Sequence, residues 1–177
     1  MTNVTSLFVK WITHDLATPA ATVMTASELL GAHGDAEING LVQGGAKRLV
    51  ARLRLIRAAF APGSAPLAAA ALERLLREGI DGTPIGWAHP ADASGVEAAM
   101  VAGSALLLTE LAKGIAVTVT PDGVSWDTPP PAGAALVHAF TDLDPTESRS
   151  ALAAMVRDAG KRAGLTVTAT PAGIGWT

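Results

Sequence analysis

The chain has 177 residues, of which 49% are hydrophobic, and its formal net charge is −3. The apolar content excludes a disordered chain, and the lack of a global positive charge argues against a nucleic-acid partner. The chain contains no cysteine, which excludes a disulfide scaffold and thiolate chemistry. The absence of cysteine suits a reducing compartment, so we expect a cytoplasmic protein.

Nothing in the sequence predicts a membrane segment. The N-terminus lacks the basic region and apolar core of a secretory signal, and the longest uncharged apolar stretch, residues 98–108, is too short to span a bilayer. The charge is unevenly distributed, at +2 for residues 1–61 and −5 for the remainder. The basic excess is either a solvated helix face or a docking surface for an acidic partner. It consists of Lys47, Arg48, Arg52, Arg54 and Arg57.

Residues 4–32 predict a long amphipathic helix that carries a histidine on its exposed face. An apolar seam recurs along it at helical spacing. The seam consists of Ile12, Leu16, Pro19, Val23, Ala26 and Leu30. Two residues turn a helix by about 200°, so His14 points away from Ile12. A neutral imidazole in this position is a nucleophile that a protein carrying a phosphoryl group can approach, and Asp15 could hold its tautomer. We therefore predict a phosphorylation site.

A second helix follows a turn at residues 31–35 and ends at Pro62-Gly63, where proline and glycine stop it. The two helices should form an antiparallel hairpin. A lone helical pair cannot bury its apolar seam well, so two copies are expected to pack as a four-helix bundle, making the protein a homodimer. Residues 1–62 are thus predicted to be a dimerisation and histidine phosphotransfer hairpin.

The turn near residue 34 sets the register of the two helices. Positions whose numbers sum to about 68 should lie level, which places His14 opposite Arg54 and puts Arg57 one turn further on. Two guanidinium groups there could stabilise a phosphoryl charge or bind the partner proteins, with simple solvation as the alternative.

A second domain is predicted over residues 63–177, because short β-like runs there alternate with alanine-rich helices. Two segments, 114–126 and 164–176, repeat one hairpin pattern with Pro-Asp-Gly and Pro-Ala-Gly turns. Each follows a helix, at residues 95–113 and 145–163, and Asp144 is the predicted N-cap of the later one. A strand near residues 84–88 would complete a mixed sheet. The fold class is therefore α+β: a helical hairpin followed by a small α/β sandwich.

The string His14-Asp15-x-x-Thr18-Pro19, the basic helix Ala51-Arg52-Leu53-Arg54-Leu55-Ile56-Arg57 and the α/β half together resemble a known family. The sequence is similar to the alphaproteobacterial histidine phosphotransferases of the ChpT type. These proteins are built like a histidine kinase whose ATPase domain has degenerated. The resemblance implies that a histidine accepts a phosphoryl group from the aspartate of one receiver domain and passes it to another, without ATP. The receivers would belong to a hybrid histidine kinase and to response regulators, and they would supply the Mg²⁺.

Carried onto this chain, the resemblance assigns the phosphoacceptor role to His14 and an orienting role to Asp15. Thr18 lies where related bifunctional kinases hold a polar residue that positions water, although a tolerated surface threonine would look the same. Small side chains beside the histidine would let a receiver helix pack closely. They are Ala17, Ala21, Thr22 and Thr25.

The nucleotide chemistry of a kinase is missing from the sequence. No G-x-G-x-x-G or G-x-x-x-x-G-K-[ST] string occurs, and the helix at residues 96–113 offers Ala105-Leu106-Leu107-Leu108-Thr109-Glu110 where a magnesium-holding Asn should stand. We therefore expect no ATP binding, and no metal or cofactor site in the protein itself. His33, His89 and His138 have no partner at metal-ligand spacing. The competing hypotheses are a non-catalytic adaptor that regulates a kinase or receiver by binding, and a true histidine kinase with a diverged nucleotide site.

Overall fold

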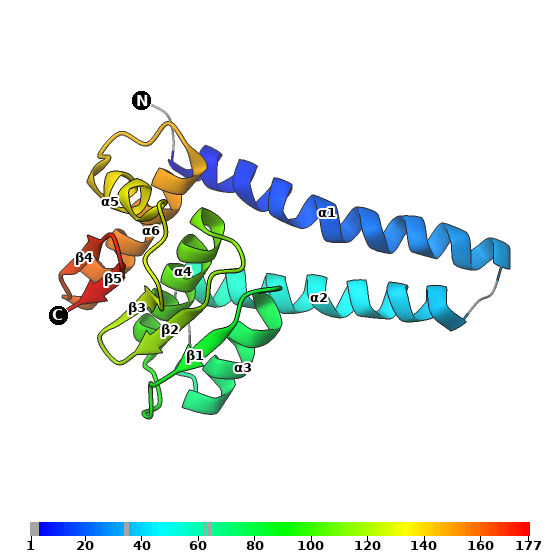
Figure 1. The fold of residues 1–177 in the computed structure, drawn as a ribbon, viewed down its shortest axis with the longest axis horizontal. Coiled ribbons are helices and arrows are strands. Elements are labelled where there is room, and N and C mark those ends of the chain that lie inside the picture. The colour runs from blue at the N-terminus through cyan, green and yellow to red at the C-terminus, as the bar shows by residue number, and fades with distance from the viewer. Residues whose placement is uncertain (1–3, 34–35, 62, 64) are drawn as a thin grey trace.

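The computed structural model describes residues 4–33, 36–61, 63 and 65–177, with residues 31–33 described by their backbone alone. The described chain is α+β, with a long helical hairpin that projects from a smaller mixed domain (Figure 1). The helices are α1 (Val4–His33), α2 (Ala36–Phe60), α3 (Ala69–Gly79), α4 (Gly95–Leu111), α5 (Gly133–Thr141) and α6 (Ser148–Ala163). The strands are β1 (Ile85–Trp87), β2 (Val117–Thr120), β3 (Gly123–Trp126), β4 (Val167–Thr170) and β5 (Gly173–Trp176).

The hairpin forms as the apolar periodicity predicts. α1 and α2 run antiparallel along most of their lengths (Figure 1), and α1 continues through Pro19. The predicted seam of α1 is half-buried or buried, whereas the stripe that contains His14 is exposed. α1 extends one residue beyond the predicted end at residue 32, and the rest of the predicted turn, Gly34-Asp35, lies outside the described residues.

The strands form one mixed sheet in the order β1-β2-β3-β5-β4. β1 pairs with β2 in parallel, and the other neighbours are antiparallel. The two predicted hairpins are confirmed and share one register, because Val117 pairs with Trp126 as Val167 pairs with Trp176. Both tryptophans are buried and belong to the hydrophobic core.

α4 is the centre of the molecule. It contacts β2 and β3 on one side, and α2 and α6 on others. Every residue from Met100 to Thr109 is buried, which explains why this segment is apolar all round rather than amphipathic. None of the helices in the described part of the chain combines the length and the apolar character that crossing a membrane requires.

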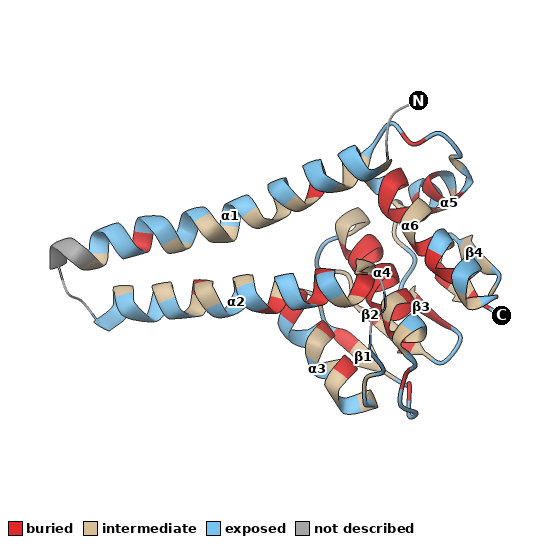
Figure 2. Cartoon of the chain, turned by 180° about the vertical axis from the view of Figure 1, so that it is seen from behind, coloured by how far each residue is buried: buried red, intermediate tan, exposed pale blue. Residues whose placement is uncertain are grey.

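The hairpin is anchored to the second domain at one end. α2 packs on α3 and α4, and α1 contacts α6 (Figure 1). The distal half of the hairpin extends beyond the second domain, and burial is concentrated around α4 and the sheet (Figure 2). Because the hairpin and the second domain share a packed interface, residues from both can build one site.

One predicted helix start is wrong. α6 begins at Ser148, with Glu147 as its N-cap and no side-chain cap hydrogen bond, rather than at Pro145 after Asp144. The backbone N–H of Asp144 instead donates to Asp142 Oδ1 at 3.1 Å. This local turn competes with the helix, as short acidic side chains commonly do.

Candidate functional site

His14 lies on the exposed face of α1. Its side chain is exposed, and within the described residues no hydrogen bond or ion pair involves its ring. The stripe of small residues around it is exposed as well. This stripe comprises Ala17, Thr18, Ala21, Thr22 and Thr25. The imidazole is therefore accessible to a macromolecule that approaches from outside the hairpin.

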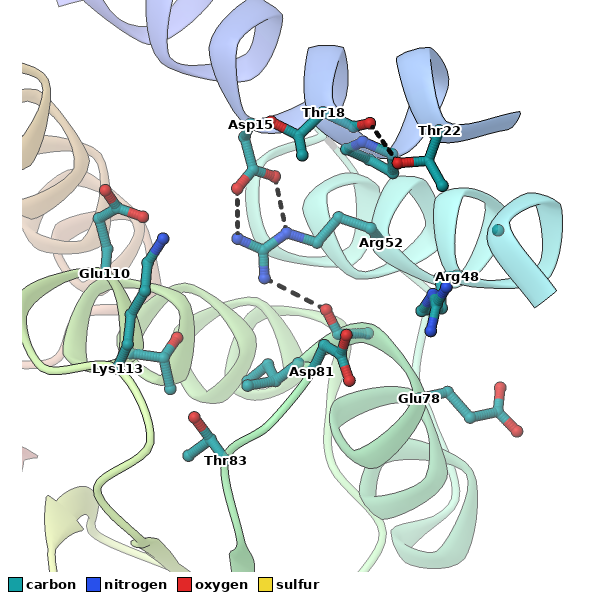
Figure 3. Close-up of a pocket in the computed structure, with 15 residues that line it drawn as sticks. Asp15, Thr18, Thr22, Arg48, Arg52, Glu78, Asp81, Thr83, Glu110 and Lys113 are labelled. Carbon is teal, nitrogen blue, oxygen red and sulfur yellow. Dashed lines mark hydrogen bonds and ion pairs between the residues drawn. The ribbon is translucent and has the colours of Figure 1, made fainter. Parts of the chain in front are cut away.

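Asp15, the next residue, turns toward Arg52 on α2 (Figure 3). Its Oδ2 accepts a hydrogen bond from Arg52 Nε at 2.7 Å, and its Oδ1 accepts one from Arg52 Nη2 at 2.8 Å. The two side chains are only 16% and 18% exposed. This bidentate, partly desolvated pair is the strongest type of charge-assisted contact between side chains.

Arg52 also joins the hairpin to the second domain. Its Nη1 donates to the backbone oxygen of Gly79, the last residue of α3, at 3.2 Å. Its guanidinium carbon lies 5.9 Å from the ring centre of buried Trp11, which packs with Phe8 and Phe60. One guanidinium thus contacts α1, α2 and α3, and its planar fork suits several fixed partners at once.

Gly79 permits this close approach. A Cβ atom at this position would lie 2.8 Å from both Cβ and Cδ2 of Leu55, and 3.2 Å from the backbone oxygen of Ala51. Only a residue without a side chain lets the end of α3 lie this close to α2. The Gly79 oxygen can therefore reach Arg52.

A cleft of about 440 Å³ opens between the hairpin and the second domain beside this network. Figure 3 shows charged side chains from both parts pointing into it. The hairpin contributes Asp15, Thr18, Pro19, Thr22, Gly45, Arg48 and Arg52, and the second domain contributes Glu78, Gly79, Ile80, Asp81, Thr83, Thr109, Glu110 and Lys113. Both signs of charge are present, so the cleft favours neither a polyanion nor a polycation.

The predicted register is correct, but the facing residues differ from those expected. Asp15 contacts Arg52, and a Cβ atom on Gly45 would lie 2.8 Å from Val23 Cγ2. The residue numbers in each of these facing pairs add up to about 68, as the predicted register requires. Arg54 and Arg57 are exposed and line grooves formed by α2, α3, α4 and the segment after α2, with no lining residue from α1. Within one chain they do not gather around His14.

Arg52 is the residue that sequence reasoning missed. It belongs to the basic run of α2, and the predicted register concerns His14 and Arg54 rather than Asp15. Applied to Asp15, the same rule points to position 53, one residue from Arg52, and the basic character of Arg52 is the signal that would have singled it out.

The remaining histidines do not join this site. His89 is 1% exposed, with Nδ1 3.0 Å from the backbone oxygen of Ala91 and Nε2 3.2 Å from Glu97 Oε1. Glu97 also closes the capping box that starts α4, so His89 has a structural position. His138 is exposed on α5, and the side chain of His33 lies outside the described residues. In the described ranges no three His, Cys, Asp or Glu side chains are grouped as metal ligands would be.

Comparison with known proteins supports the fold. No described protein family matches the sequence, and no curated protein matches it either. The chain is similar to a solved structure of a bacterial phosphotransferase, with a TM-score of 0.69 and 17% sequence identity, over 98% of this chain and 94% of the other. At this identity the likeness establishes a shared fold along nearly the whole chain.

Proposed function

We propose that the protein is a dimeric phosphorelay histidine phosphotransferase of the ChpT type, with His14 as the phosphoacceptor. The observation that carries this proposal is an imidazole that stands exposed and unbonded on a helix face, bordered by small side chains. The fold shared with a bacterial phosphotransferase supports the same reaction class.

In the proposed step, a lone pair of the His14 ring attacks the phosphorus of a receiver's aspartyl phosphate. A P–N bond forms, the P–O bond to the aspartyl oxygen breaks, the carboxylate leaves, and one ring proton passes to solvent. The reverse step, with a second receiver, returns the phosphoryl group to an aspartate. The receiver contributes the Mg²⁺ that neutralises the developing charge, so this chain needs only to present the imidazole.

The small residues around His14 fit this role. Ala17, Ala21 and Thr25 leave the ring protruding above its neighbours, which allows a receiver helix to pack closely beside α1. Thr18 and Thr22 border the cleft instead. The Thr22 hydroxyl donates to the backbone oxygen of Thr18 at 3.0 Å, and Thr18 is itself exposed, so in this proposal its hydroxyl is available to position water. In this proposal Arg54 and Arg57 are exposed cations for an acidic partner surface.

The dimer is proposed from apolar residues that one chain leaves uncovered. Val9 and Met24 on α1 are 55% and 65% exposed, and Val50 and Leu53 on α2 are both 45% exposed. At about 100° per residue these four lie on the side of the hairpin opposite Thr18 and the cleft. Packing two such faces together gives a four-helix bundle while leaving His14 open.

A labelling experiment tests the function. A receiver carrying ³²P-labelled aspartyl phosphate and Mg²⁺ is mixed with the wild type, with His14→Gln and with His138→Gln, which removes the other exposed histidine of the described chain. We expect acid-labile, alkali-stable label on the wild type and on His138→Gln, and none on His14→Gln. An unlabelled wild type that still binds the receiver would replace the proposal with the adaptor hypothesis. Labelling of His14 from ATP alone would indicate a kinase.

A further inference from the structure

Arg52 has a place in the site that its packing does not fully explain. Three of its nitrogens are engaged, two on Asp15 and one on the Gly79 oxygen, and the pair is screened from water on most sides. The carboxylate it holds belongs to the residue next to the exposed imidazole. Asp15 directly follows His14, and consecutive Cα atoms are about 3.8 Å apart, so the carboxylate and the ring start from the same turn of α1.

An uncompensated carboxylate at this position would oppose phosphorylation, because it would repel a phosphoryl group, which carries negative charge. The bidentate bond to Arg52 cancels the carboxylate charge and draws the group into the cleft, away from the exposed side of α1 (Figure 3).

We propose that Arg52 is a positioning residue for His14: it neutralises Asp15 and holds it in the cleft, so that a phosphoryl donor meets an imidazole without an unpaired carboxylate beside it. The second domain takes part through the Gly79 oxygen, which holds the guanidinium in its orientation. This inference rests on the proposed role of His14 as a phosphoacceptor. It also assigns a task to the second domain, namely to set the charge environment of the phosphoacceptor.

The test uses phosphoramidate, a small donor that requires no receiver. Its P–N bond breaks as the new P–N bond to the ring forms, and the ring proton leaves on the ammonium product. The rate of His14 phosphorylation is measured at pH 7 on the full chain, with His14→Gln as the blank. We expect Arg52→Gln to react about fivefold more slowly than the wild type, from the Coulomb energy of one unpaired carboxylate that water reaches once the guanidinium is gone.

Two further measurements separate charge compensation from a merely structural role. The double variant Arg52→Gln/Asp15→Asn should recover the wild-type rate, and 1 M salt should remove most of the difference between Arg52→Gln and the wild type, because salt screens exposed charges. Arg52→Lys keeps the charge without the fork and should react at an intermediate rate. Arg77→Gln breaks an exposed arginine–carboxylate pair on α3 and should leave the rate unchanged.

Each result decides the inference. Unchanged reaction of folded Arg52→Gln, or a slow rate that neither Asp15→Asn nor salt restores, would overturn it. Failure of a phosphorylated receiver to label His14, with the phosphoramidate rates as expected, would refute the proposed function and leave the role of Arg52 intact.

Discussion

The contact between Asp15 and Arg52 should be a major stabilising interaction between the two helices of the hairpin. Its two hydrogen bonds measure 2.7 and 2.8 Å, and hydrogen bonds to charged groups contribute roughly 1.5–3 kcal/mol when buried. The side chains of Asp15 and Arg52 are 16% and 18% exposed, so solvent screens part of this energy. We expect a coupling free energy of about 2 kcal/mol between the two residues.

A double-mutant cycle measures this coupling. The wild type, Asp15→Asn, Arg52→Gln and the double variant are unfolded in urea and followed by tryptophan fluorescence, since Trp11 lies against Arg52. One fixed protein concentration is used, because the unfolding of a dimer depends on it. The cycle isolates the pair from the other contacts that each residue makes.

The pair Glu73 and Arg77 is the matched control. Arg77 Nη2 lies 2.7 Å from Glu73 Oε1, but the two side chains are 49% and 30% exposed. Its coupling should be about 0.3–0.5 kcal/mol, as for other exposed pairs one helical turn apart. If the Asp15–Arg52 coupling were no larger than that of the control, the argument that burial strengthens this contact would be wrong.

Three further outcomes are expected. Leu53→Glu should shift the protein from dimer to monomer in analytical ultracentrifugation. The control Leu143→Glu, at a position 88% exposed on the second domain, should leave the dimer intact. A dimer unchanged by Leu53→Glu would place the interface elsewhere. Gly79→Ala should lower the free energy of unfolding by about 1–3 kcal/mol, because its Cβ would overlap Leu55. Gly40→Ala should instead raise it by about 0.5–1 kcal/mol, since nothing lies within 4 Å of the added atom; a loss of stability in urea unfolding would contradict this.

Much of the architecture could be predicted from the sequence because it depends on local periodicity. The apolar seam of α1 and the proline and glycine after α2 determine a helical hairpin and its register. The repeated Pro-x-Gly turns determine two β-hairpins that share one pairing pattern. The exposure of His14 follows from the same periodicity, since it lies about 200° around the helix from Ile12.

The identity of the residues that meet at the site depended on tertiary packing. Sequence reasoning assigned Asp15 to His14, whereas the folded chain pairs it with Arg52, 37 positions away. The close approach of α3 supports this pairing, because Gly79 has no side chain and its backbone oxygen accepts a further hydrogen bond from the Arg52 guanidinium. The start of α6 is a second case, because a turn at Asp142 replaced the predicted cap.

The sequence by itself therefore determined which side of α1 is apolar and which presents the imidazole, because both follow from the 3.6-residue period of a helix. Only the tertiary structure decided where the charge beside that imidazole goes. A carboxylate pairs most strongly with a cation that offers two well-aligned hydrogen bonds in a site shielded from water. Here the packing of α1, α2 and α3 places Arg52 in that position.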